Sequence, residues 1–261
     1  MKGAPDVLTR ILPLLAVLLC AVQGRAIVSP ADLHTMTLPE GLKGRIGGTM
    51  NVNRGSVESV RQGLGFLVAH KRGSATDFLL GDYTYEERDK KRYQIVRYGH
   101  ARDIRRLGSW IDWETLAQYN SNDRLRLTER VLGGGGFRIR AVDDDASGRK
   151  VFFGLGLFRE KEVLAEADGA FDAGTEWTTR GSLYLVLRHD FPADVSATCG
   201  AYWQPQVDDS DDSRLFIQAT LSKKLSEDLA LAIVFSMQED SEPPDNVRPT
   251  TTNVSVALTW T

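Results

Sequence analysis

The stretch "TTNVSVALTWT" (residues 251–261) ends the chain on a strict alternation of two residue kinds. Every second residue from Val254 to Trp260 is large and apolar. The residues between them are small, and all but Ala257 are polar. The apolar set is Val254, Val256, Leu258 and Trp260. A period of two predicts a β-strand with one apolar face. A terminal strand of this kind, with an aromatic residue near its end, is typical of the last strand of a membrane β-barrel, where aromatic rings lie at the bilayer interface.

The same alternation recurs through most of the chain. It predicts about twelve strands, an even number, as single-chain bacterial barrels have. The segments are 44–53, 59–71, 77–86, 92–101, 109–120, 125–141, 151–161, 179–189, 195–205, 213–223, 228–238 and 252–261. Glu129 breaks the alternation of its segment, which indicates a β-bulge or a locally different register there. The expected fold is all-β, an up-and-down antiparallel transmembrane β-barrel.

A soluble sandwich or lipocalin-like barrel is the rival fold, because it shows the same alternation with the apolar face turned inward. Two features favour the membrane barrel. The strands are about ten residues or longer, the length a tilted strand needs to cross a bilayer. The polar face carries many long charged side chains, which a barrel interior can hold.

The N-terminus predicts export from the cell interior. Residues 1–26 combine a basic start, a short apolar core and small residues near Ala26, the pattern of a cleaved signal peptide. Residues 27–42 are expected to be a periplasmic lead-in, and residues 43–261 the barrel. We therefore expect the outer membrane of a Gram-negative-type bacterium as the location, with outer-membrane lipid and the barrel-assembly machinery as partners. The net charge of −3 gives no reason to expect a nucleic-acid partner.

The predicted connections differ in length between the two ends of the barrel. The longest, 166–178 and 239–251, fall on the side expected to be extracellular, as in known barrels. The segment 142–150 is the exception, because it is long for a periplasmic turn. Aromatic residues are expected at both membrane interfaces. The interface set is Tyr83, Tyr119, Trp203 and Trp260.

Charged residues recur on the face expected to line the lumen. The lumen-lining set is Arg45, Arg61, Asp82, Glu114, Arg126, Arg130, Arg138, Arg180 and Arg214. Two interpretations stay open. In the first, opposite charges pair and fill a narrow barrel. In the second, the excess of arginine lines a pore that favours anions.

The segment 116–162 is the most distinctive part of the sequence. It contains Gln118-Tyr119-Asn120, then Arg130, then four glycines from Gly133 to Gly136 followed by a phenylalanine, and "FFGLGLFRE" at 152–160. These features resemble the YdiY-like family of β-barrel proteins of unknown function, often described as salt-induced outer-membrane proteins. The resemblance extends over most of 41–261 and implies an outer-membrane barrel. It brings no active site to carry over. One departure from the family is Thr261, which follows Trp260.

Other motifs favour structural roles. The four glycines lack the Lys and Ser/Thr of a phosphate-binding loop, so we interpret them as a strand bend or a close approach of an interior group. The acidic runs 143–145 and 208–212 match no Ca²⁺ loop and are interpreted as solvated turns. His70, His100 and His189 are expected at periplasmic strand ends, away from the outer rim where a lipid hydrolase would act. No catalytic residue, cofactor or metal site is predicted.

Three functions remain as hypotheses. The first is a structural or permeability component, in the form of a narrow channel or a closed barrel without enzymatic activity. The second is a ligand-binding or adhesion module that acts through the two long loops. The third is an outer-membrane lipid hydrolase.

Overall fold

The computed structural model describes residues 34–35, 38–54, 58–226 and 229–260, without the side chains at positions 45, 49 and 257–260. The described residues form one antiparallel sheet of 12 strands, and a short 3₁₀ turn, η1, at Asp123–Leu125. The strands are β1 (Gly41–Asn53), β2 (Ser59–Arg72), β3 (Ala75–Arg88), β4 (Lys91–Arg106), β5 (Ile111–Asn122), β6 (Leu127–Asp144), β7 (Arg149–Leu164), β8 (Gly174–Phe191), β9 (Val195–Pro205), β10 (Ser213–Lys224), β11 (Leu229–Asp240) and β12 (Thr250–Trp260).

Each strand pairs with the next strand in sequence, so the topology is up-and-down throughout. The predicted all-β class, the up-and-down antiparallel topology and the number of strands are confirmed. The bulge expected near Glu129 is present as a register shift between Leu127 and Glu129 in the pairing of β6 with β7. A second shift lies between Arg140 and Val142.

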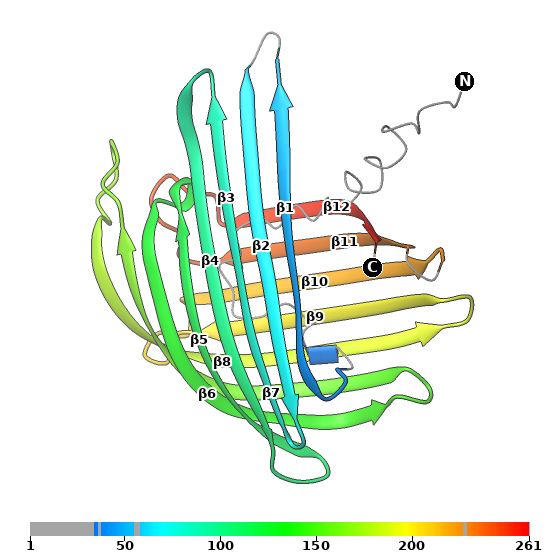
Figure 1. The fold of residues 1–261 in the computed structure, drawn as a ribbon. Helices are drawn as coiled ribbons and strands as arrows, with labels where there is room; N and C mark the ends of the chain where they lie inside the picture. Colours follow the sequence, from blue (N-terminus) through cyan, green and yellow to red (C-terminus); the bar gives the residue numbers. More distant parts are fainter. Residues whose placement is uncertain (1–33, 36–37, 55–57, 227–228, 261) are drawn as a thin grey trace, which may run out of the picture.

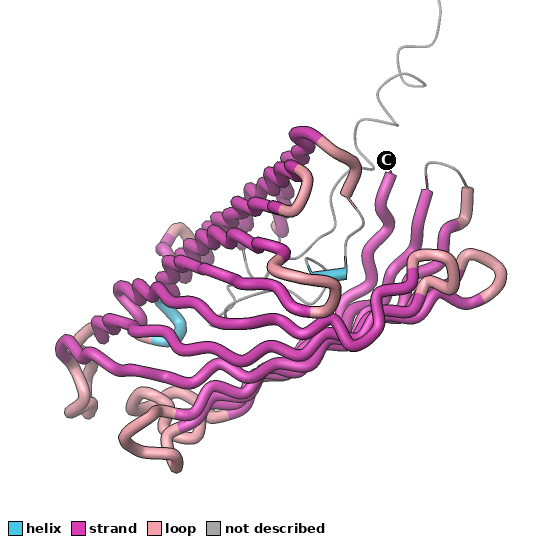
Figure 2. The backbone as a smooth tube through the Cα atoms, turned by 90° about the horizontal axis from the view of Figure 1, so that it is seen from below, coloured by secondary structure: helices cyan, strands magenta, loops and turns pink. Residues whose placement is uncertain are grey.

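The sheet is strongly curved and forms a trough (Figures 1 and 2). In Figure 1 the first strands run in a different direction from the last ones, and the two groups face each other across the trough. The expected closure is not present, because no pairing joins β1 to β12 among the described residues. The curvature is compatible with a barrel whose seam would lie between these two strands.

The two faces of the sheet have opposite chemistry. On the convex face, apolar side chains are exposed in nearly every strand; Leu183 is 39% exposed and Val256 is 59% exposed. On the concave face, charged and amide side chains are buried, together with a cluster of Phe152, Tyr184, Val186, Tyr202 and Phe216. This is the reverse of a soluble β-protein, where the exposed face is the polar one.

Three of the four glycines at 133–136, Gly134, Gly135 and Gly136, allow the neighbouring strands to approach closely. A Cβ atom at Gly136 would lie 2.3 Å from the carbonyl oxygen of Leu155 and 2.4 Å from Cα of Gly156. On the neighbouring strand, a Cβ atom at Gly154 would lie 1.8 Å from the ring of Tyr184. The expectation of a close approach is therefore confirmed, because backbone and an aromatic ring fill the space where side chains would stand.

The longest described connections lie at one end of the sheet. They are 165–173 between β7 and β8 and 241–249 between β11 and β12, somewhat shorter than expected because the strands extend further. The long turn predicted at 142–150 is wrong, because β6 continues to Asp144 and only 145–148 form the turn. All connections at that opposite end are therefore short.

Part of the predicted lead-in lies inside the trough. His34 and Thr35 are buried, Leu38 packs against the cluster formed by β2, β3 and β4, and β1 begins at Gly41. The predicted signal peptide at 1–26 lies outside the described residues. In the part of the chain that the structure describes, no helix has the length and apolar character needed to cross a membrane.

Candidate functional site

The concave face gathers most of the charged residues that the sequence predicted to line a lumen. Arg61 on β2 and Asp82 on β3 are half-buried on this face. The side chain of Arg45 lies outside the described residues. The remaining members, except Arg126, fall into two ion-pair clusters, one near each end of the trough.

The first cluster, which we call the Glu160 cluster, lies near the end with the long loops. Glu160 accepts from Arg180 at 2.8 Å and from Arg214 at 2.7 Å, and its other oxygen lies 3.9 Å from Arg130. Glu162 accepts from the Nε atom of Arg130 at 2.6 Å and from Arg214 at 3.1 Å. Strands β6, β7, β8 and β10 supply these five side chains, so the cluster ties four strands together.

Two aspartates complete the Glu160 cluster. Arg180 forms a two-armed contact with Asp212, at 2.9 and 2.6 Å, and Arg214 donates to Asp240 at 3.0 Å. Asp212 ends the acidic run 208–212 that was interpreted as a solvated turn. That interpretation is wrong for Asp212, whose side chain is largely buried against Arg180.

The second cluster, the Glu114 cluster, lies nearer the other end. Glu114 contacts Arg102 at 3.2 Å, accepts from the hydroxyl of Tyr184 at 2.7 Å, and lies 3.6 Å from Arg138. Tyr184 belongs to β8 and Glu114 to β5, so the bond from the Tyr184 hydroxyl crosses the trough. His34 also reaches this cluster, with its Nε2 atom 2.9 Å from Arg102 and its ring 4.6 Å from that of Tyr184.

Asp112 completes the Glu114 cluster through contacts with two arginines. Arg138 donates to it at 2.6 and 2.8 Å, and the Nε atom of Arg140 lies 3.1 Å from its other oxygen. Counting both clusters, six arginines face carboxylates at contact distance, five of them buried and Arg138 half-buried. A buried charge is tolerated when it is paired and hydrogen-bonded, so these residues fill the interior as ion pairs and do not form a free arginine lining.

Arg126 differs from the prediction. It lies in the turn between η1 and β6, with a left-handed backbone (φ 55°), and does not lie on a strand. Its guanidinium donates to Asp172 at 2.6 Å, to the carbonyl of Asp245 at 3.0 Å and to the carbonyl of Ala165 at 2.7 Å. Arg126 therefore joins the two long loops at the mouth of the trough.

The two loops also bond to each other. The backbone N–H of Asp245 donates to Asp172 at 2.8 Å, and the backbone N–H of Phe171 donates to Asp245 at 2.8 Å. We call these contacts, together with Arg126, the loop lock. The lowered pKa of Asp172 reflects the balance of these contacts. Burial raises this pKa, but the Asp245 N–H and the Arg126 guanidinium outweigh that effect and hold it below the usual range.

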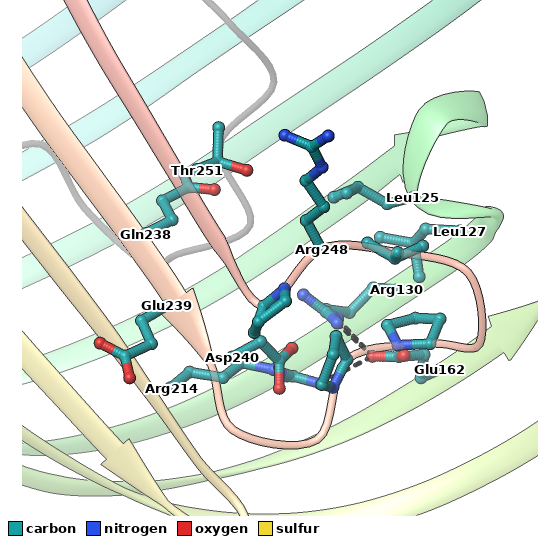
Figure 3. A pocket seen from close by; sticks show the side chains of 14 residues that line it. Leu125, Leu127, Arg130, Glu162, Arg214, Gln238, Glu239, Asp240, Arg248 and Thr251 are labelled. Atoms are coloured by element: carbon teal, nitrogen blue, oxygen red, sulfur yellow. Dashed lines mark hydrogen bonds and ion pairs between the residues drawn. The ribbon is translucent and has the colours of Figure 1, made fainter.

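The locked loop 241–249 lies over the Glu160 cluster. Figure 3 shows this loop above the ion pairs that Arg130 and Arg214 make with Glu162. Between loop and cluster, a cavity of about 50 Å³ is lined by Leu125, Leu127 and Pro244 besides the charged residues. Such a volume admits a few water molecules and is far below the 300–1,000 Å³ of typical ligand pockets.

The aromatic residues sort by position along the strands. Tyr83, Tyr119 and Trp203 are exposed on the convex face toward the end with the long loops. Trp113 and Phe153 are exposed on the same face toward the other end. The side chain of Trp260 lies outside the described residues. Two separated belts of this kind match the two interfaces of a bilayer.

The three histidines on the strands occupy two kinds of place. His70 and His189 lie near the ends of β2 and β8, as expected. His100 does not, because it is buried in the middle of β4 with a ring nitrogen 3.3 Å from Gln118. Its predicted position at a strand end is wrong.

The curved sheet, the charged interior and the belts agree with what a comparison of the sequence finds. Residues 48–261 match the family model described as "Protein of unknown function, DUF481". The chain belongs to this family. DUF481 is the family of YdiY-like salt-induced outer-membrane proteins, so the resemblance seen in 116–162 is confirmed. No curated protein matches the sequence.

Some members of the site carry no signal in the amino-acid sequence. His34 precedes the first strand and shows no periodicity, so its place in the Glu114 cluster was not predictable. Asp172 and Asp245 lie in loops, where only the fold shows which residues meet. Glu160 and Asp112 did carry a signal, since both lie on the polar face of an alternating strand.

Proposed function

We propose that this chain is an outer-membrane β-barrel whose lumen is closed in the resting state, and that it serves as a structural or permeability component without enzymatic activity. Two facts support the membrane. Apolar side chains cover the convex face and the charged ones are buried on the concave face, the arrangement that acyl chains outside and a polar interior require. Membership of the DUF481 family agrees with this location.

The ion pairs of the Glu160 cluster are the observation that best supports a closed lumen. Its central carboxylate is 2% exposed and lies between three arginines. An anion entering this region would have to replace Glu160 at those arginines. The three arginines already form ion pairs that link neighbouring strands. Their charges are therefore neutralised by carboxylates, which argues against a steady pathway for anions.

Fractionation and conductance test this proposal together. The protein should be found in the outer-membrane fraction and should change its mobility on gels when heated, as folded barrels do. In planar bilayers it should give no steady conductance of porin size. Glu160→Gln should destabilise the barrel. A large, anion-selective conductance of the unmodified protein would refute the closed lumen, and recovery in the soluble periplasmic fraction would refute the barrel itself.

A second function, binding through the loops, is favoured by one observation. Phe171 is 95% exposed at the tip of loop 165–173, yet its backbone N–H is held by Asp245. An exposed aromatic on an ordered loop suits a contact with a partner, because little entropy is lost on binding. Loss of binding to a host or cell surface in Phe171→Ser, with no loss in a matched Phe191→Ser control at the other end, would support this role.

A further inference from the structure

The chain just before β1 enters the trough from the end with the short turns. We call its described residues, 34–35 and 38–40, the strap. At the rim, the side chain of Glu40 accepts from the backbone N–H of Gly73, in the turn between β2 and β3, at 3.1 Å. Figure 1 shows the strap in blue inside the trough, beside the start of β1. It takes no part in the pairing of the described strands, so no ladder of sheet hydrogen bonds holds it there.

The ring of His34, at the inner end of the strap, fills the space between two walls of the trough. Its side chain is fully buried. On one wall, its Nε2 atom lies 2.9 Å from Arg102 of β4 and its Nδ1 atom lies 3.8 Å from Glu114 of β5. On the other wall, its ring centre lies 4.6 Å from that of Tyr184 of β8 and 6.2 Å from that of Tyr202 of β9. One imidazole ring thus bridges both walls at the level where the Tyr184 hydroxyl bonds to Glu114.

A second anchor of the strap lies nearer the rim. The side chain of Leu38 packs against the apolar cluster that β2, β3 and β4 form on the concave face, and its carbonyl accepts from the Nζ atom of Lys71 at 3.1 Å. The chain then passes into β1 through Gly41, whose φ of 97° is a backbone conformation that favours glycine. The strap therefore has two separate anchors, one at His34 and one at Leu38.

The contacts of His34 hold the ring incompletely. Among the described residues, its Nδ1 atom has no hydrogen-bond partner, and a buried polar atom without a partner opposes burial. Arg102 also pairs with Glu114 at 3.2 Å, so release of the ring leaves this charge paired. Release therefore breaks one hydrogen bond and the ring packing, and it leaves the sheet intact. Local opening of this kind occurs without global unfolding.

We propose that the strap is a gate at the periplasmic end of the lumen. The space between Arg102, Glu114 and the two tyrosines is a binding site for an imidazole ring, which His34 occupies in the closed state. This inference rests on the proposed outer-membrane barrel with a closed lumen. It adds a barrier in series with the Glu160 cluster and the loop lock, which lie at the other end. Release of the strap gives access to the lumen from the periplasm.

The modification rate of an introduced thiol measures the state of the gate. Ser182 is buried on the concave face of β8, two residues from Tyr184 toward the end with the long loops. Ser182→Cys in a Cys199→Ala background places a thiol there with little change of volume. The probe is a trimethylammonium methanethiosulfonate reagent, which is water-soluble and charged. It is added to the full mature chain folded in detergent, and the rate should be slow.

Two substitutions loosen the strap at its two anchors. His34→Ala removes the ring, and Leu38→Ser weakens the apolar contact. Their matched controls outside the strap are His70→Ala near the end of β2 and Leu42→Ser, an exposed leucine at the start of β1.

Both loosening substitutions should raise the modification rate about tenfold, because the rate follows the open population, and losing the contacts of one buried side chain shifts that population by about this factor. The controls should leave the rate unchanged. Added imidazole should restore protection in His34→Ala and not in Leu38→Ser, because only the former has an empty ring site. A heat-modifiable gel shift verifies folding, and Leu38→Ser decides the result if His34→Ala does not fold.

An unchanged rate in both loosened variants would overturn the gate. A raised rate in Arg126→Ala alone would assign the barrier to the loop lock and would also overturn it. A raised rate in His34→Ala that imidazole does not lower would overturn the ring site. The failure of the proposed function has different signatures. Fast modification before the strap is altered would mean an open lumen, and a protein absent from the outer-membrane fraction would mean no membrane barrel.

Discussion

Replacing Gly136 by alanine probes the curvature that brings the two ion-pair clusters together. The added methyl group would lie 2.3 Å from the carbonyl oxygen of Leu155 and 2.4 Å from Cα of Gly156. Ordinary carbon contacts are about 3.5 to 4.0 Å. Both atoms belong to the backbone of β7, which cannot rotate away as a side chain can. Strand β7 must therefore move by about 1 Å relative to β6.

The cost of that movement follows from the packing around it. Overpacking a close-packed site costs about 1 to 3 kcal/mol. A shift of about 1 Å also weakens the neighbouring ladder hydrogen bonds, and each buried group left without a partner costs about 1 to 3 kcal/mol. We expect Gly136→Ala to lower the free energy of unfolding by about 3 kcal/mol or more.

Gly133 provides the matched control in the same run of glycines. A Cβ atom there would have its nearest neighbour, the carbonyl oxygen of Leu116, at 3.8 Å, an ordinary contact. Gly133→Ala should change the free energy of unfolding by less than about 1 kcal/mol, because alanine mainly reduces the freedom of the unfolded chain. Urea unfolding of the barrel refolded in lipid vesicles, followed by tryptophan fluorescence, measures both. If the two variants differ by less than about 1 kcal/mol, the close approach of β6 and β7 is not as described.

Three further outcomes are expected. Glu160→Gln should lower the free energy of unfolding in the same urea assay by about 3 to 5 kcal/mol, because a neutral amide would face three buried arginines; a loss under about 1 kcal/mol would contradict the cluster. Arg126→Ala should make loop 241–249 sensitive to added protease without changing the unfolding midpoint, whereas Arg124→Ala, in the same turn but outside the loop lock, should not. The pKa of Asp172 is lowered, despite its burial, by the Asp245 N–H and the Arg126 guanidinium, so the loop lock should be complete above about pH 4 and weaken as the pH falls further. Pepsin cleavage of loop 165–173, measured at each pH relative to an unfolded reference substrate, should then rise below that pH, and Asp172→Asn should reduce this rise.

Alternation predicted the facing of the strands because each side chain in a strand points opposite to its neighbours. Val256 and Leu183 are exposed on the convex face as expected, and Arg180 and Arg214 are buried on the concave one. Alternation could not predict the arginine pairings, since these depend on the register between strands and on the curvature that brings β6, β7, β8 and β10 together.

The errors arose where the two-residue period is interrupted. The bulge between Arg140 and Val142 shifts the phase of β6, so the alternation predicts a turn where the strand in fact continues to Asp144. Arg126 shares the parity of Arg130, but the left-handed turn at Arg126 places it outside the strand. His34 and Asp212 act at long range in sequence, and no local pattern reports such contacts.

Nitroxide scanning along β10 is the most direct measurement of which face meets lipid. Spin labels at successive positions from 215 to 221, in a Cys199→Ala background and in lipid vesicles, report collisions with oxygen, which dissolves in acyl chains. The collision rate should be high at the odd positions, such as Ile217, and low at the even ones, such as Gln218. High oxygen collision at Gln218 with a protected Ile217 would mean that the apolar side chains form an interior core, and the membrane barrel would be contradicted.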